Sequence, residues 1–158
     1  MLSKNIEIRA FCMADMCDFK EMFCSYFRKD FKIEIKDKQV DSICQEIADS
    51  SISEITSLDI LLINGETVGF ICYQIDTSKS DWCEREGWGF IREIFINPKL
   101  RGNNYGLKLV HHAETKLYTK GVDHIYLTSD EAGEFWNLCG YRNTGIVSSI
   151  NHDPIYEK

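Results

Sequence analysis

The segment from Trp88 to Gly121 constrains the fold more than any other part of the chain. It opens with a run from Trp88 to Ile96 that is apolar at odd and even positions and is interrupted only by Arg92 and Glu93. A strand that is apolar on both faces is typical of the interior of a sheet. After a turn, the apolar residues follow helical spacing at Gly106, Val110, Ala113 and Leu117. The segment therefore predicts a central strand, a turn and an amphipathic helix.

The residues before this segment predict one strand, two helices and a hairpin. Ile6 and Ile8 alternate with polar residues, as in a strand, and Asp15 and Asp37 stand where they can cap two helices. The apolar stripes of these helices are Met16, Phe19, Phe23 and Phe27 in the first and Val40, Ile43, Cys44 and Ile47 in the second. Asn64-Gly65 separates two apolar runs, Leu58 to Ile63 and Val68 to Ile75, and favours a tight turn because both residues tolerate positive φ angles.

The residues after the segment predict two further strand regions around a short helix. The expected elements are a strand from His124 to Ser129, a helix from Glu131 to Cys139 and a closing pair of strands, Tyr141 to Val147 and Pro154 to Glu157. The order of elements is typical of an α+β or mixed α/β protein. The length suits one domain, and no repeat or linker divides residues 1–158.

Composition argues against several classes of partner. Acidic residues outnumber basic ones by 25 to 18, for a net charge of −7, so a nucleic-acid partner is not expected. No apolar run is long enough to span a membrane and no signal pattern is present, which predicts a cytoplasmic protein. Reduced, buried thiols are favoured over a metal site or disulfides for Cys12, Cys17, Cys24, Cys44, Cys72, Cys83 and Cys139, which include no C-x-x-C pair. His111 and His112 point to different helix faces, and no metal site is predicted.

The turn Arg101-Gly102-Asn103-Asn104-Tyr105-Gly106 is the main candidate for chemistry. The backbone N–H groups at a helix N-terminus bind anions such as phosphate. Two glycines allow a ligand close to the backbone, and Arg101 adds a positive charge for a pyrophosphate. These six residues alone leave a glycine turn without a ligand equally open.

Two motifs resemble those of the GCN5-related N-acetyltransferase (GNAT) family. Glu93-Ile-Phe-Ile-Asn-Pro98 followed by Arg101-Gly102-x-x-x-Gly106 resembles its acetyl-CoA-binding segment, and Phe135 to Tyr141 resembles a late motif of the family. The order of elements agrees from Ile6 to Lys158. The resemblance implies a mostly antiparallel twisted sheet of about seven strands flanked by about four helices.

The resemblance also implies the residues that bind acetyl-CoA, and no metal. The pantetheine arm is expected along the strand beside a bulge, the pyrophosphate at the turn, and a hydrogen bond at the end of the next strand. The cofactor-binding residues are then Ile94, Phe95, Ile96, Arg101, Gly102, Asn103, Asn104, Tyr105, Gly106, Leu107 and Ser129. Three residues depart from the family pattern: Asn104 replaces a glycine, Ser129 replaces a frequent Asn, and Trp136 replaces a frequent Tyr that protonates the leaving thiolate.

The implied function is transfer of an acetyl group from acetyl-CoA to a primary amine by direct attack on the thioester. Glu93 is the candidate general base, because it alternates with Ile91 and Phe95 on an apolar face beside the expected thioester; an ion pair or a solvent-facing charge is the alternative. The acceptor is a small cationic molecule or a peptide or protein amine, and the protein is a monomer or a homodimer. The acidic stretch from Asp76 to Glu86 favours a cationic acceptor, although a solvated loop explains it equally well.

Two other functions stay open. Asn104 and Trp136 are compatible with a non-catalytic acyl-CoA-binding or sensor module, which would keep the pocket without the chemistry. A nucleotide-binding protein is the weaker alternative, since the turn lacks the Gly-Lys-Ser/Thr ending of a P-loop. Phe23, Tyr26 and Phe27 are interpreted as core, although they could wall the acceptor site.

Overall fold

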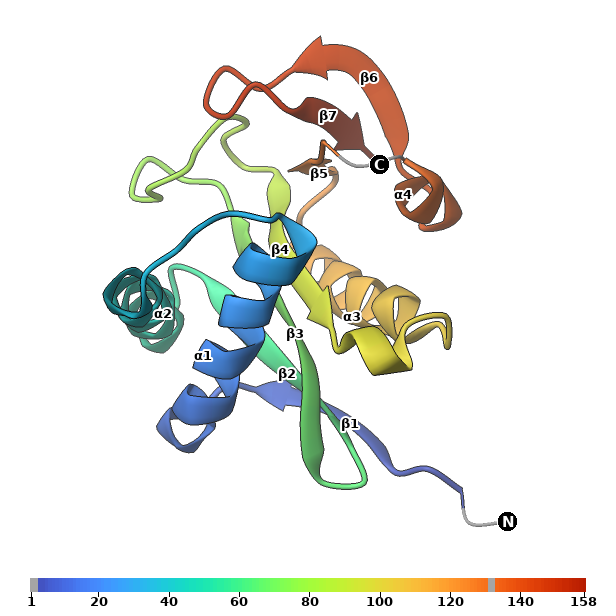
Figure 1. Cartoon of the computed structure of the whole chain (residues 1–158). Coiled ribbons are helices and arrows are strands. Elements are labelled where there is room, and N and C mark those ends of the chain that lie inside the picture. The colour runs from blue at the N-terminus through green and yellow to red at the C-terminus, as the bar shows by residue number, and fades with distance from the viewer. Residues whose placement is uncertain (1–2, 131–132) are drawn as a thin grey trace.

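The computed structural model describes residues 3–130 and 133–158, and in this part of the chain seven strands form one sheet (Figure 1). The elements are β1 (Ile6–Ala10), α1 (Met16–Ser25), α2 (Asp37–Ile52), β2 (Ser57–Ile63), β3 (Glu66–Ile75), β4 (Gly89–Ile96), α3 (Tyr105–Thr119), β5 (Ile125–Thr128), α4 (Glu134–Leu138), β6 (Arg142–Val147) and β7 (Pro154–Glu157). A π-helical turn, Tyr26–Asp30, extends α1. The predicted fold class and the order of elements are confirmed.

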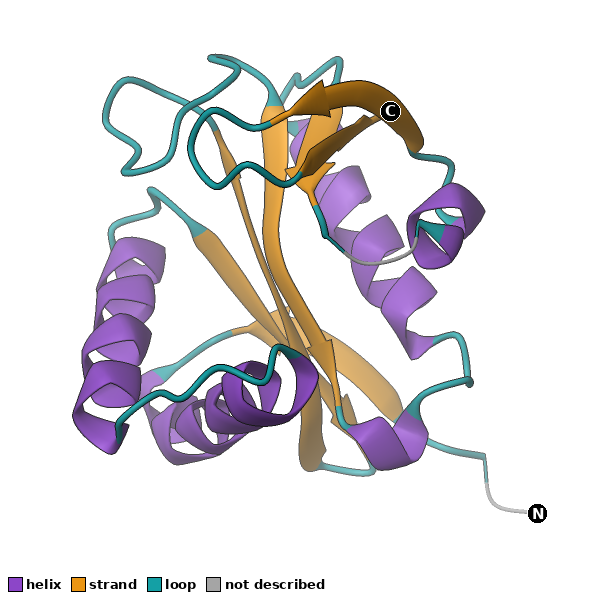
Figure 2. Ribbon diagram, turned by 45° about the horizontal axis from the view of Figure 1, so that its top comes forward, coloured by secondary structure: helices purple, strands orange, loops and turns teal. Residues whose placement is uncertain are grey.

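The sheet runs in the order β1-β2-β3-β4-β5-β7-β6, and every neighbouring pair is antiparallel except β4 and β5. The predicted central strand, β4, lies in the middle of this order. Helices α1 and α2 cover one face, and α3 and α4 cover the other (Figure 2). Because β4 is covered on both faces, it needs apolar residues on both, as its sequence has.

The predicted hairpin joins β2 and β3. Asn64 and Gly65 both adopt positive φ angles, 52° and 81°, so the turn has the left-handed geometry that these two residues favour. The hairpin thereby aligns Ile60 with Phe70, two fully buried side chains in the layer beneath α1 and α2.

Neither predicted helix cap forms its side-chain bond, although Asp15 does occupy the N-cap position of α1. Asp15 does cap a short 3₁₀ turn through a bond from the Cys12 backbone N–H at 2.9 Å, but its side chain does not cap α1 and pairs in bidentate fashion with Arg9. Asp37 is the first residue of α2 rather than its cap, and its carboxylate contacts Arg28 at 2.7 Å. Each carboxylate thus forms a charge-assisted pair with an Arg side chain and no cap bond to its predicted helix.

The expectation of buried thiols holds only in part. Cys44, Cys72 and Cys139 are buried, whereas Cys12, Cys17 and Cys83 are exposed; all seven cysteines are free. The beginning of the helix predicted at Glu131 lies outside the described residues, and the described helix is α4. In the described part of the chain, no helix is long and apolar enough to cross a membrane.

Candidate active site

A β-bulge in β4 sets the orientation of the site. Cys72 of β3 lies opposite Glu93, and the next residue, Tyr73, lies opposite Ile91, so Arg92 is the extra residue. A bulge of this kind breaks the regular alternation of side chains along a strand. Glu93 therefore shares its face with Phe95, below α1, whereas Ile91 packs with the α3 layer. The predicted alternation of Glu93 with Ile91 on one face is wrong for this reason.

The bulge coincides with a gap in the sheet. Strands β4 and β5 pair only at Gly89–Ile125 and Phe90–Tyr126, and beyond these pairs the two strands separate. A pocket of about 980 Å³ lies there, between β4, the π-helical turn, the residues around the start of α3 and the end of β5. The resemblance to the family implies a bulge and a separated strand beside the pantetheine arm, and β4 has both features.

Strand β4 offers backbone groups to this pocket. The Asn97 N–H donates to the Val68 carbonyl on the β3 side, so alternation turns the N–H and C=O groups of Ile94 and Ile96 toward the pocket. The Ile96 carbonyl already accepts a hydrogen bond there from Arg101 Nε at 2.9 Å. The backbone groups of Ile94 are thus the ones placed to pair with a ligand laid along the strand.

Glu93 lies in the wall of the pocket and is held by Tyr26, whose hydroxyl donates to Glu93 Oε2 at 2.5 Å. Burial raises the pKa of the Glu93 carboxyl, while the hydrogen bond from Tyr26 and the charge of Arg92 act in the opposite direction. A carboxylate with a raised pKa, hydrogen-bonded in a pocket, has the properties of a general base.

The turn before α3 has the backbone geometry of a ligand-binding loop. Gly102 has φ +86°, and Asn104, the residue that precedes α3, has φ +64° with no side-chain cap bond. Asn104 thus adopts the left-handed conformation that a glycine would otherwise supply. Gly102, Asn104, Tyr105, Gly106 and Leu107 line the pocket, whereas Asn103 is not among the lining residues and donates its side-chain N–H to the Leu100 carbonyl.

Two residues of this region behave differently from the sequence prediction. A Cβ on Gly106 would lie 3.1 Å from the Phe135 ring. This glycine therefore allows α4 to pack on α3, a role that the sequence prediction did not include. The guanidinium of Arg101 forms a bidentate pair with Asp30, at 3.0 and 2.7 Å. The positive charge of Arg101 is therefore already balanced in part by the carboxylate of Asp30 in the π-helical turn.

Comparison with known proteins identifies the family. The profile of the acetyltransferase (GNAT) family matches residues 18–141. The chain belongs to the GNAT acetyltransferase family. No curated protein sequence matches it significantly.

Solved structures share the fold at low sequence identity. A GNAT-family acetyltransferase from Staphylococcus aureus Mu50 is 19% identical over 98% of both chains, with a TM-score of 0.76. The PaiA N-acetyltransferase from Thermoplasma acidophilum, solved in complex with coenzyme A, is 17% identical over 98% of both chains, with a TM-score of 0.73. An aminoglycoside 6′-acetyltransferase of type Ii is 16% identical over 96% of both chains, with a TM-score of 0.74.

The two other departures from the GNAT pattern lie in the pocket wall. Trp136 is 8% exposed and packs edge-on against Tyr141, with 5.8 Å between ring centroids, so it contributes to the core as well as to the pocket. Ser129 lies at the end of β5, where its backbone N–H donates to the Pro154 carbonyl at 3.0 Å. At both positions the pocket wall thus carries a side chain that differs from the one frequent in the family.

Sequence reasoning favoured a core role for the aromatic residues beside Glu93 and left a role in the pocket wall as the alternative. Tyr26 and Phe27 line the pocket, together with Phe31, while Phe23 is core as interpreted. The helical spacing of these rings does not distinguish core from pocket. The distinguishing feature is the hydroxyl of Tyr26, which meets a carboxylate 67 positions away in the sequence.

Two of the four acidic residues between β3 and β4 have structural partners, which weakens their use as an argument for a cationic acceptor. Asp76 is fully buried and accepts hydrogen bonds from Gln74, from Tyr126 and from backbone N–H groups of its own loop. Glu84 accepts bonds from the backbone N–H and the hydroxyl of Ser149. These carboxylates hold the loop to the sheet.

Proposed function

We propose that this GNAT protein is an acetyl-CoA-dependent N-acetyltransferase that transfers the acetyl group to a primary amine. One observation carries the proposal: a carboxylate with a raised pKa, Glu93, stands in the pocket where β4 and β5 separate. The solved relative with coenzyme A and the aminoglycoside acetyltransferase support acetyl-CoA and an amine as the substrates, because they share this fold.

The residues of the pocket suit the parts of acetyl-CoA. The backbone groups of Ile94 fit a strand-like amide chain, which supports a pantetheine arm that lies along Ile94 to Ile96. The N-terminus of α3, with Gly102 and the residues up to Leu107, fits the pyrophosphate. Arg101 would reach the phosphates by sharing its two guanidinium bonds with Asp30.

The chemistry then follows from the position of Glu93. Its carboxylate accepts a proton from the acceptor ammonium, and the neutral amine attacks the thioester carbon. The C–N bond forms, the C–S bond breaks and the sulfur leaves as a thiolate. The nitrogen then loses a second proton to become the amide nitrogen, the thiolate takes up one proton as coenzyme A, and Glu93 returns its proton to solvent. A thiol pKa of ~8.5 makes this thiolate a good leaving group. Trp136, whose indole N–H can donate a hydrogen bond but is not an acid, is therefore compatible with turnover.

A non-catalytic acyl-CoA sensor is the second candidate, since Asn104 and Trp136 depart from the family pattern. The geometry argues against it, because a buried carboxylate held by Tyr26 is costly to keep unless it has a use. That residues 1–158 form one domain, and that the protein acts in the cytoplasm as a monomer or a homodimer, stay predictions.

Two measurements test the proposed function. Acetyl-CoA is expected to raise the melting temperature while ATP does not, because only a bound ligand stabilises the folded state. Release of the coenzyme A thiol is then followed with a panel of amines. Binding without turnover of any amine would favour the sensor, and no binding would contradict the proposal altogether.

A further inference from the structure

The bulge in β4 brings a second charged side chain into the pocket. In a regular strand Arg92 would face away from Glu93, but as the extra residue of the bulge it turns to the same face, where its Nη1 bonds Gln74. Arg92 and Glu93 both line the pocket. The two residues are consecutive in the chain, with Cα atoms about 3.8 Å apart, so one pocket receives a cation and a carboxylate from neighbouring positions.

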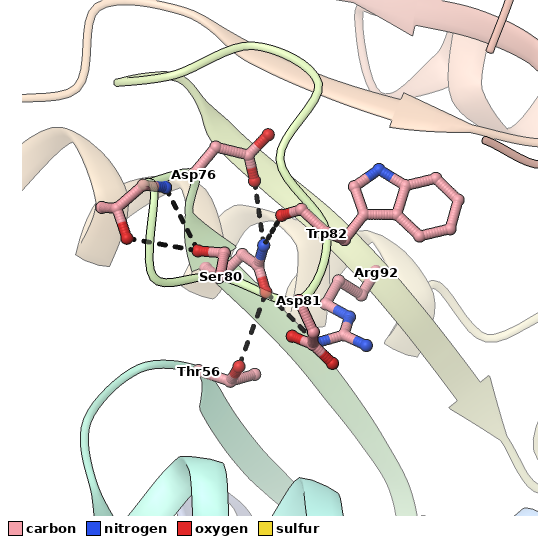
Figure 3. A network of polar contacts seen from close by, with 8 residues as sticks. Thr56, Asp76, Ser80, Asp81, Trp82 and Arg92 are labelled. Carbon is pink, nitrogen blue, oxygen red and sulfur yellow. Dashed lines mark hydrogen bonds and ion pairs between the residues drawn. The ribbon is translucent and has the colours of Figure 1, made fainter. Parts of the chain in front are cut away.

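Arg92 is held by a buried polar network (Figure 3). Gln74 is 2% exposed, and its amide N–H groups donate to Asp76 Oδ1 at 2.9 Å and to the Trp82 carbonyl at 2.7 Å. These two bonds fix the orientation of the amide, so its oxygen must face the side on which Arg92 Nη1 donates to it at 3.2 Å. The guanidinium is thus positioned by groups that have no contact with the pocket opening.

Most of the hydrogen-bonding capacity of this guanidinium is unused by the described residues. Within them, Nη1 contacts Gln74 and Asp81, while Nε and Nη2 have no hydrogen-bond partner. The Asp81 contact is long, 3.5 Å, and that carboxylate is 69% exposed, as Figure 3 shows it beside Arg92 at the loop. An ion pair of this kind is weak, so it competes poorly with a ligand. A side chain that is only 20% exposed and has free donors is suited to bind an anion.

The chemistry of that anion follows from its surroundings. One guanidinium matches one negative charge, and the planar fork of Arg fits a carboxylate in bidentate fashion. A phosphate dianion would bring two negative charges beside Glu93, where Arg92 is the adjacent cation; Lys29 and Arg101 also line the pocket, but Arg101 is already paired with Asp30. The amine of the acceptor must reach Glu93, the adjacent residue, so amine and carboxylate must lie close together in the same molecule.

We propose that the acceptor is an amino acid, whose amine meets Glu93 and whose carboxylate binds Arg92. The inference rests on the proposed function and names its substrate class. It differs from a polycationic acceptor, because a second ammonium group would be repelled by Arg92. Asp130 and Asp153 also line the pocket and would favour a diamine, so diamines are the competing outcome of the test.

The test compares each of a panel of amino acids with its own amide, which keeps the amine and side chain but removes the negative charge. Coenzyme A thiol release gives kcat/KM for each pair, and simple diamines are measured beside them. We expect the best amino acid to exceed its amide by about 10- to 100-fold, the scale of a hydrogen-bonded charge pair. Without an effect of the carboxylate, the amide should be the better substrate, because the amine of an amino acid amide loses its proton more easily than that of the amino acid.

Variants separate binding by Arg92 from a structural role. Arg92→Gln is expected to lower kcat/KM for the amino acid by about 10- to 100-fold and to leave the amide nearly unchanged, and Arg92→Lys should recover part of the loss. Asp81→Asn removes the competing carboxylate and is the matched control, with kcat/KM for the amino acid equal to or above that of the unaltered protein. An unchanged melting-temperature shift with acetyl-CoA confirms that each variant is folded.

Three results would overturn the inference: equal rates for acids and amides, a preference for diamines, or an equal loss for acid and amide in Arg92→Gln. In each of these an amine is still acetylated, so the proposed function survives. If no amine is acetylated although acetyl-CoA binds, the proposed function is wrong, and the inference about the acceptor is wrong as well because it depends on that function.

Discussion

Replacing Glu93 with Gln tests the mechanism most directly. Gln keeps the size of the side chain and an oxygen that accepts the hydrogen bond from Tyr26, but it cannot take up a proton. The change therefore removes the base and little else. Acetyl-CoA affinity should be retained, because the expected contacts of the cofactor are with the backbone of β4 and with the turn before α3.

The size of the effect is bounded by the proton that must be removed. Neutralising an amine of pKa ~10.4 at pH 7 costs about 4 to 5 kcal/mol, which limits what any base contributes. General bases usually give at least about 100-fold, or about 2.7 kcal/mol. We therefore expect kcat/KM of Glu93→Gln to fall by about 100-fold near pH 7. The deficit should shrink as the pH approaches the pKa of the acceptor amine, since more of the amine is then already neutral.

The assay measures kcat/KM by coenzyme A thiol release across a pH range, with a saturating acetyl-CoA concentration. In the unaltered protein the rate should rise with pH through the raised pKa of Glu93, because only the ionised form is a base.

The stability of the Glu93→Gln variant is the control. A raised carboxyl pKa means that ionised Glu93 costs stability, and that this cost appears as the pH rises through the folded-state pKa. Glu93→Gln should therefore be at least as stable as the unaltered protein at pH 7.

A folded Glu93→Gln protein with unaltered kcat/KM at every pH would refute this mechanism. The carboxylate would then be structural, and the amine would lose its proton to water or to another group. A deficit that stays constant with pH would also contradict it, because a lost base becomes unnecessary once the amine is neutral.

Three further changes probe the neighbourhood of the site and the fold. Tyr26→Phe removes the hydrogen bond that lowers the Glu93 pKa, so the rise of kcat/KM should move to higher pH, and an unmoved profile would show that the bond does not tune the base. Asn104→Gly relieves a positive φ of 64° and should raise stability by about 0.5 to 1 kcal/mol without weakening acetyl-CoA binding, measured by thermal unfolding with and without the ligand. The pairing of Asp15 with Arg9 lowers the pKa of Asp15 from 3.8 to about 2, so Asp15→Asn should cost about 2 kcal/mol at neutral pH. That difference should vanish as the pH falls through about 2, and urea unfolding at both pH values checks it.

Local patterns in the sequence determined the elements of this protein. The hairpin at Asn64-Gly65, the central strand β4 and the helix after the glycine turn all depend on interactions between near neighbours. Turn chemistry and the spacing of apolar residues report such interactions directly. The family motifs around Glu93 and Arg101 then indicated the cofactor, because they lie on contiguous stretches of chain.

The tertiary structure alone decided which side chains meet in the site. The bulge at Arg92 turned two adjacent charges to one face, and its position depends on the register of β4 against β3, which the sequence of β4 does not specify. Tyr26 became a partner of Glu93 only because α1 packs on the sheet, and Asp30 reached Arg101 across 71 positions of sequence. The predicted cap bonds of Asp15 and Asp37 failed on a shorter scale, since each carboxylate pairs with an arginine that lies 6 or 9 positions earlier in the chain. Contacts between residues far apart in the chain depend on how whole elements pack, and no periodicity within one element encodes them.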